Sequence, residues 1–138
     1  MNIKLISRED AVDHWPWLSS KFAEAAAHGQ GESTMVDYLQ KILNFHAQCW
    51  VIIEEDGTWS GAGLTEILTY PQHKTLHIIL FTGVDFEKQS KVLPIVEEFA
   101  KTNGCTALEA WGRGGWARML PKHIPEFKEV YRVFRKPL

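Results

Sequence analysis

The chain opens with a short alternation of apolar and polar side chains, which changes to helical spacing within ten residues. The stretch NIKLIS (2–7) alternates and predicts a first strand. Ser7, followed three residues later by Asp10, resembles a capping box, so a helix should begin at residue 8 and extend to about residue 27. Because Pro16 lacks a backbone donor, it should either kink this helix or begin a second piece of it.

The middle of the chain changes from helical to strand-like spacing. Thr34 and Asp37 have the spacing of a second cap, and the apolar residues after them predict a helix over 33–45. Beyond it, short apolar runs predict three antiparallel strands, with Asp56-Gly57 as a hairpin signal between the first two. These strands should span residues 49–53, 59–70 and 75–81.

A strongly amphipathic pattern follows the three strands. It predicts a helix with a core face made of Val92, Ile95, Val96 and Phe99. Pro94 is best tolerated in the first turn of a helix, so this helix should begin near Ser90 and span 90–103. Asn103-Gly104 should end it.

The last third predicts a strand at 105–111, a short helix at 113–120 and a final strand at 129–134. Since no repeat or linker interrupts the chain, residues 1–138 should form a single domain. The element order predicts a mixed α/β (α+β) fold with about six strands in one central sheet. The first two helices should cover one face and the long helix the other, with the strands before and after the long helix side by side and parallel.

Composition narrows the class of protein. The chain has 138 residues, of which 45% are hydrophobic and 23% charged, as in ordinary globular proteins. A net charge of −2 argues against a nucleic-acid surface, which is normally basic. We find no apolar run long enough for a membrane span and no signal-peptide core, so the chain is expected to be cytoplasmic. Cys49 and Cys105 adjoin apolar runs and should be reduced thiols.

The element order, with VEEFAKTNGC (96–105) closing the long helix, resembles the GNAT family of acyl-CoA-dependent N-acetyltransferases. The likeness covers nearly the whole chain, with the last one or two strands of the family shortened to one. The phrase WGRGGW with Leu120-Pro121 also resembles divergent GNAT-like proteins of phages and prophages, which would imply a virion-associated location. The resemblance implies acyl-CoA and an amine as substrates.

Members of the family bind the coenzyme A pyrophosphate on backbone N–H groups where the long helix begins, in a loop whose glycines allow close approach. Here the two glycine positions fall on Glu87 and Gln89, and Asp85 adds negative charge. The N–H groups of the first residues of the predicted helix could still face an anion. The resemblance therefore implies a weak acetyl-CoA site at Phe81, Thr82, Gln89, Ser90, Lys91, Val92 and Arg113.

The resemblance also implies where the chemistry should lie. Many members carry a general-acid Tyr in a phrase like A-x-x-L-Y; Ala117 and Leu120 match it here, but Pro121 holds the Tyr position and has no proton to give. A general base is expected on the third or fourth strand, where Glu66 and His77 are the candidates. Burial would raise the pKa of Glu66 toward neutral pH. The simpler interpretation is that each is an ordinary strand residue, at an edge or hydrogen-bonded in the sheet.

Two other patterns concern the face of His77 and the glycines after the strand at 105–111. Strict alternation places His77 on one face of its strand with Ile79 and Phe81. GRGG (112–115) follows a strand and precedes a helix, where Arg113 or Arg118 could meet a ligand carboxylate or phosphate, although a plain strand exit explains the glycines equally well. The histidines and cysteines do not have the spacing of a metal site, and no metal is expected.

Three functions from different classes remain open. The first is an N-acyltransferase with a degenerate coenzyme loop and weak or lost activity. The second is a catalytically silent GNAT-like structural or interaction protein of phage or prophage type, for which an oligomer or a protein partner is expected. The third is a small-molecule binding module that keeps the pocket of the fold without its chemistry. Neither a nucleic acid nor a membrane is expected as a partner.

Overall fold

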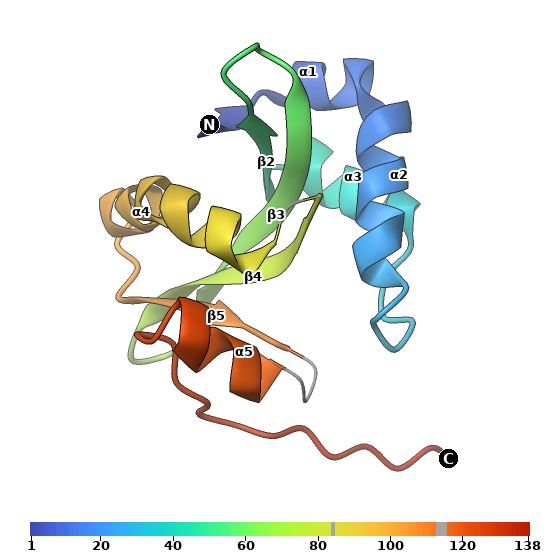
Figure 1. The fold of residues 1–138 in the computed structure, drawn as a ribbon. Helices are drawn as coiled ribbons and strands as arrows, with labels where there is room; N and C mark the ends of the chain where they lie inside the picture. The colour runs from blue at the N-terminus through green and yellow to red at the C-terminus, as the bar shows by residue number, and fades with distance from the viewer. Residues whose placement is uncertain (84, 113–115) are drawn as a thin grey trace.

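Five strands form one central sheet in the structure, a computed structural model that describes residues 1–83, 85–112 and 116–138 (Figure 1). The strands lie side by side in chain order, the first four antiparallel and the fifth parallel to the fourth. This confirms the mixed sheet and its parallel pair. The strands are β1 (Asn2–Ile6), β2 (Gln48–Ile53), β3 (Trp59–Thr69), β4 (Lys74–Thr82) and β5 (Ala107–Ala110).

Helices cover both faces of the sheet, as the element order predicts. Figure 1 shows the blue and cyan helices on one side and the yellow to orange α4 on the other, with α5 beside β5. The first group is α1 (Arg8–Asp13), α2 (Trp15–Ala26) and α3 (Met35–Leu43). The others are α4 (Phe86–Thr102) and α5 (Trp116–His123).

Local signals explain where the first three helices begin. The Ser7 hydroxyl accepts a hydrogen bond from the Asp10 N–H and caps α1. Pro16 lies in the first turn of α2, so it begins a second helix rather than kinking one. Thr34 and Asp37 form the complete capping box predicted for α3.

Two hydrophobic clusters hold the helices to the sheet. One lies between the sheet and α1–α3 and is centred on Leu18, Phe22 and Ile42. The other lies under α4 and is centred on Trp50, whose indole N–H donates to the Thr65 hydroxyl at 2.9 Å. Cys49 and Cys105 are buried free thiols, as predicted.

The core face of α4 differs from the prediction at one position. Val92 and Val96 are buried, but Ile95 is 44% exposed and Leu93 is buried in its place. The buried residues Val92, Leu93, Val96 and Ala100 define a stripe, and at 100° per residue Ile95 lies about 115° from its centre. Phe99 is half-buried, and its ring meets the Trp50 ring edge-on at 5.3 Å.

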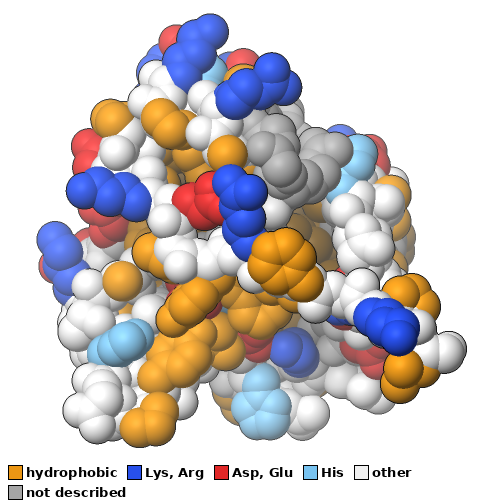
Figure 2. Space-filling model, turned by 90° about the horizontal axis from the view of Figure 1, so that it is seen from below, with side chains coloured by type: hydrophobic (Ala, Val, Ile, Leu, Met, Phe, Trp, Pro, Cys, Tyr) orange, Lys and Arg blue, Asp and Glu red, His pale blue; other side chains and the backbone are white. Residues whose placement is uncertain are grey.

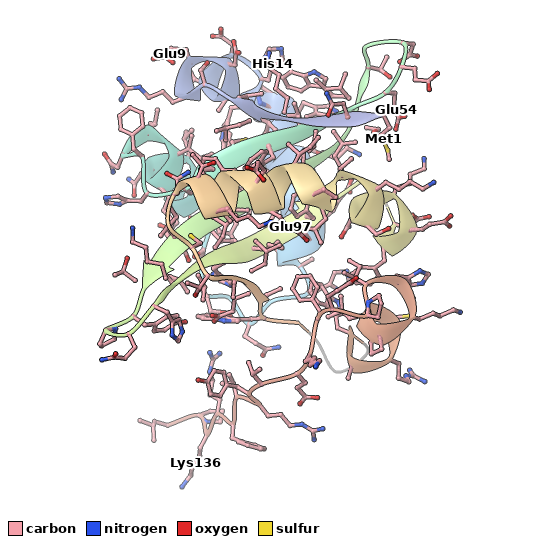
Figure 3. All side chains as sticks on the ribbon, turned by 90° about the vertical axis from the view of Figure 1, so that its left-hand side faces the viewer. Met1, Glu9, His14, Glu54, Glu97 and Lys136 are labelled. Carbon is pink, nitrogen blue, oxygen red and sulfur yellow. The ribbon has the colours of Figure 1, made fainter. Side chains whose placement is uncertain are left out.

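The predicted final strand is wrong: residues 129–134 are neither helix nor strand, and the sheet has five strands rather than six. Ile124 is the last buried residue of the chain. Figure 3 shows Lys136 at the far end of this segment, well away from the sheet. Alternation alone cannot form a strand, because a strand needs a neighbour to pair with. Within the described residues, no helix is long and apolar enough to cross a membrane.

Candidate functional site

Three ionisable side chains form a row across the middle of the sheet. Glu66 on β3 lies directly opposite His77 on β4, and His77 lies beside Glu109 on β5. Paired positions on neighbouring strands project to the same face of a sheet. The row lies on the face covered by α1–α3, because Lys41 of α3 reaches Glu66. The sheet therefore joins the two candidate bases that the sequence offered separately.

The Glu66 carboxylate has a partner at each oxygen. One oxygen lies 3.1 Å from Nδ1 of His77, and the other accepts from Nζ of Lys41 at 2.6 Å. The hydrogen bond with His77, together with the Lys41 ion pair and against the effect of partial burial, lowers the pKa of Glu66 to about 2. The predicted rise toward neutral pH is therefore wrong, because these two partners stabilise the charged form more than burial disfavours it.

His77 lies between this carboxylate and an exposed aromatic ring. Its side chain is 7% exposed, and the centre of its ring is 4.4 Å from that of Trp111, a residue that is 69% exposed. Since an ionised carboxylate can only accept, Nδ1 of His77 donates to Glu66. For Nε2, the described part of the structure records no hydrogen-bond partner.

Glu109 extends the polar row to the edge of the sheet. It accepts hydrogen bonds from the Tyr70 hydroxyl at 3.0 Å, the Thr75 hydroxyl at 3.1 Å and the indole N–H of Trp111 at 2.9 Å. Partial burial would raise the pKa of Glu109, but these hydrogen bonds outweigh it and lower the pKa. The outer end of the row is therefore an ionised carboxylate between two aromatic side chains.

A β-bulge in β4 follows His77 and changes which side chains share its face. Leu64 pairs with Leu80, whereas the next residue, Thr65, pairs with Ile78, so Ile79 is the extra residue on β4. Ile79 packs with the cluster under α1–α3, on the His77 side, but Phe81 packs with the cluster under α4. The predicted shared face is thus correct for Ile79 and wrong for Phe81.

The start of α4 also differs from the prediction. The helix begins at Phe86 rather than near Ser90, and the Asp85 carboxylate caps it by accepting from the Lys88 N–H at 2.9 Å. Pro94 lies inside the helix on its exposed side, where the Ser90 carbonyl that loses its partner can meet water. The N–H groups of Ser90, Lys91 and Val92 belong to the interior of the helix and bond four residues back.

A hollow of about 310 Å³ lies where α4 begins and α5 passes. The Phe86 ring meets the Trp116 ring edge-on at 5.4 Å and lies 6.3 Å from the His123 ring, so aromatic contacts connect the two helices here. No lysine or arginine lines the hollow among the described residues. Its lining consists of Asp85, Phe86, Glu87, Gln89, Met119 and His123.

The other predicted coenzyme contacts lie at the end of β4 and beyond the described residues. The Phe81 ring covers Gly63 so closely that an added Cβ would come within 2.4 Å of it. Thr82 is buried and ends β4. Arg113 lies outside the described residues, whereas Arg118 is exposed on α5. Pro121 lies inside α5.

Across the described ranges, no group of three or more His, Cys, Asp or Glu side chains could hold a metal ion. The contact of His77 with a carboxylate and a ring is instead that of an oriented imidazole.

Sequence reasoning missed Lys41, Glu109 and Trp111. Lys41 follows the helical pattern of α3 and looks like a solvated residue until α3 is placed over β3. Glu109 lies in the strand predicted at 105–111, and Trp111, the last residue of that prediction, follows the end of β5 at Ala110, but nothing local indicates that they meet His77. One weak signal exists, because Glu109 stands among small and apolar residues in a short strand.

No protein-family model matches the chain, and no curated protein matches it in sequence. Solved structures match it over its full length. A probable acetyltransferase superposes with a TM-score of 0.74 at 10% identity, covering 100% of this chain and 98% of the other. A GNAT family acetyltransferase from Staphylococcus aureus gives a TM-score of 0.68 at 17% identity, covering 99% of this chain and 97% of the other.

An aminoglycoside acetyltransferase from an uncultured soil metagenomic sample, solved in complex with sisomicin, gives a TM-score of 0.70 at 13% identity. This match covers 99% of the present chain and 95% of that protein. At such identities the likeness establishes the fold, and the chain has the fold of the GNAT acetyltransferases. None of the three is described as a phage protein, so the narrower resemblance gains no support.

Proposed function

We propose that the chain is an acyl-CoA-dependent N-acyltransferase in which His77 is the general base and Glu66 positions it. The observation that carries the proposal is the 3.1 Å contact between the two side chains on adjacent strands, just before the bulge of β4. The GNAT fold supports an amine as acceptor, by analogy with the acetyltransferases that share it.

In this proposal His77 accepts the proton, and Glu66 orients the His77 ring. A protonated amine must lose a proton before it can attack an acyl group. With a pKa of about 2, Glu66 is ionised at neutral pH and is a poor proton acceptor, but it can hold the Nδ1–H of His77. Nε2 then keeps its lone pair and takes the proton of the amine, directly or through a water. Lys41 keeps Glu66 in place through the second oxygen.

Acyl-CoA would supply the acyl group as a thioester, and the described residues fit its pyrophosphate only in part. In favour are the N–H groups of Phe86 and Glu87 in the first turn of α4, which have no helical acceptor, and the charges of Lys88 and Lys91. Against it stand the Asp85 carboxylate, which already caps the helix, and the charge of Glu87.

The expected result of this conflict is weak binding. A charge-assisted hydrogen bond contributes roughly 1.5–3 kcal/mol to binding. Losing two of them therefore raises the dissociation constant of the coenzyme by a factor on the order of 10² to 10⁴. Of the contacts implied by the family, Phe81 and Thr82 end β4, and Gln89 and Lys91 can reach out from α4 by their side chains. Since Pro121 has no proton to donate, we propose slow transfer without a general acid from α5.

The test is acetyl-CoA-dependent acetylation of a polyamine, an aminoglycoside and a peptide amine. The reaction is monitored through the release of free coenzyme A thiol. We expect slow turnover, and His77→Gln should lower kcat/KM by at least about 100-fold. Glu66→Gln should lower it less and shift its pH profile, because the ring loses its charged partner. His73→Gln is the matched control, an exposed histidine on the same hairpin. Equal activity in His77→Gln and the parent chain would exclude His77 as the base.

Binding is tested separately by calorimetric titration with acetyl-CoA. We expect a millimolar or weaker dissociation constant. Micromolar binding that is lost in Lys91→Glu would show that the start of α4 holds the coenzyme despite its carboxylates.

A silent GNAT-like protein or small-molecule binding module is the second candidate, favoured by the self-capped start of α4 together with Pro121. It predicts that acetyl-CoA leaves the melting temperature unchanged at any concentration, since a ligand of the folded state must raise it. Turnover of any amine would exclude it.

A further inference from the structure

The C-terminal segment presents an unusual amount of apolar surface for the end of a chain. Figure 2 views the molecule from the side of this segment and shows hydrophobic side chains across this face and at its projecting end. Their exposed fractions are 73% for Val130, 82% for Tyr131 and Val133, and 89% for Phe134. Exposed apolar side chains gathered in one segment indicate an interaction surface.

The neighbouring edge of the sheet is open as well. β5 pairs with β4 along one side, and no described residue adds a strand along the other. An open edge presents unpaired N–H and C=O groups that attract another strand. β5 is short and carries no proline or lysine to discourage pairing.

We propose that two copies of this chain exchange their C-terminal segments, each adding residues 129–134 as a strand on the open edge of β5 in the other copy. Each copy carries the open edge of β5 and one unpaired segment, so a two-fold arrangement satisfies both at once. Within one copy the segment instead passes its own sheet without pairing and reaches the loop after α2, where Arg135 lies 3.9 Å from Glu32.

The alternation of the segment matches that of β5. Leu108 of β5 packs with the cluster under α4, whereas Glu109 belongs to the opposite face. With Arg132 placed beside the Glu109 carboxylate, Tyr131 and Val133 continue the apolar surface next to Leu108. Val130 and Phe134 then lie on the Glu109 face, where the exposed Trp111 ring offers a partner. Charge and hydrophobicity agree in this one register.

The buried area is sufficient for a dimer. Each segment carries two aromatic rings that can bury about 150–250 Å² each, or about 600–1,000 Å² for the four rings of the pair. The surfaces that receive them bury a similar area, which brings the total to the range of about 1,200–2,000 Å² of specific interfaces.

The test is sedimentation of the full chain over a range of concentrations. We expect a dimer that dissociates on dilution, and Val133→Pro should weaken it at least about tenfold, because proline removes a ladder donor. The segment is exposed, so this change leaves the domain itself intact. Val36→Glu, an apolar-to-charged change at an exposed position on α3, should leave the dimer unchanged. A monomer at all concentrations, or a dimer indifferent to Val133→Pro, would overturn the proposal.

A cross-link distinguishes exchange from pairing within one copy. Glu109→Cys and Arg132→Cys in one chain place two thiols side by side in the proposed register, while the native thiols are buried, with the pKa of Cys49 raised by burial to about 12. Oxidation should yield a disulfide-linked dimer on a non-reducing gel. A monomer-sized product alone would show that the segment pairs with its own β5 and would overturn the exchange.

Discussion

The β3–β4 pair and the start of α4 are the places to which the proposed function assigns its base and its coenzyme, and they are built in opposite ways. On the strands, one oxygen of Glu66 meets Nδ1 of His77, and for Nε2 the described residues provide no hydrogen-bond partner. At the start of α4, the Asp85 carboxylate accepts a hydrogen bond from the backbone N–H of Lys88, and Glu87 adds a second negative charge. The first region has a ring nitrogen with no recorded partner among the described residues, whereas the second uses its carboxylate on its own backbone.

The difference shows that capping and anion binding compete for the same backbone donors. A helix start satisfied by its own aspartate is stable without a ligand, whereas a glycine-rich start leaves its N–H groups for phosphate. The proposed base on the sheet has no such conflict, because the carboxylate that contacts His77 is not one of the proposed coenzyme contacts. On this proposal, the chain keeps a base on the sheet while its affinity for the coenzyme is weak.

The strongest way to probe the strand side is the acid dependence of stability in Glu66→Gln. The pKa of Glu66 is lowered from 4.5 to about 2, so its charge stabilises the fold above about pH 4.5, and this stabilisation is lost as the pH falls toward 2. We expect the parent chain to exceed the variant by about 3 kcal/mol in unfolding free energy at pH 6. The gap should close near pH 2 in urea titrations.

Glu98→Gln, an exposed carboxylate on α4, serves as the control and should leave the pH profile unchanged. A constant gap between Glu66→Gln and the parent chain from pH 6 to pH 2 would mean that the ion pair does not carry the effect.

The second test measures how firmly α4 is packed on the sheet. If α4 is well packed, the difference between its start and the β3–β4 pair lies in the side chains at the two places and not in a displaced helix. Phe99→Ala removes a half-buried ring that packs edge-on against Trp50. We expect a loss of about 2–3 kcal/mol, below the 3–5 kcal/mol typical of a fully buried ring. Ile95→Ala, on the exposed side of the same helix, should cost less than about 0.5 kcal/mol. Equal losses in denaturant melts would restore the core face predicted from sequence.

The smallest expected effect is on the coenzyme. Asp85→Asn keeps a good cap for α4 but removes a negative charge beside the proposed pyrophosphate position. Affinity for acetyl-CoA should rise by roughly three- to tenfold at low salt, and the gain should shrink as salt is added. Asp37→Asn makes the same change at the cap of α3 and should have no effect. Unchanged affinity in calorimetry for Asp85→Asn would exclude charge repulsion there.

Local features were predictable from the sequence because neighbouring residues cause them. The capping box of Thr34 and Asp37 is satisfied within four residues. The hairpin at Asp56-Gly57 needs a positive φ, and Gly57 has φ 87°. The parallel pairing of β4 and β5 followed from the handedness of a strand–helix–strand connection.

The two failures have different causes. Pro94 suggested a helix start, but the local contact of Asp85 with the Lys88 N–H caps the helix earlier, and the exposed position of Pro94 makes the lost hydrogen bond tolerable. The pKa of Glu66 was predicted in the wrong direction because its partners come from other elements, His77 from the neighbouring strand and Lys41 from a helix 25 residues away. The first error overlooked a local cap, whereas the second concerns contacts that only the assembled fold creates.

The bulge of β4 has a consequence for how this chain can vary in length. Ile79 shifts the alternation by one, so β4 presents Leu76 to one cluster and Leu80 to the other. Losing that single residue would remove the bulge and leave both faces as they are, because Leu80 would still pair with Leu64 and Phe81 would still lie under α4. A one-residue insertion in the regular part of the strand, before Ile78, would instead exchange the faces of the residues on one side of it. The bulge is therefore the place where β4 can change its length by one residue without exchanging its two layers.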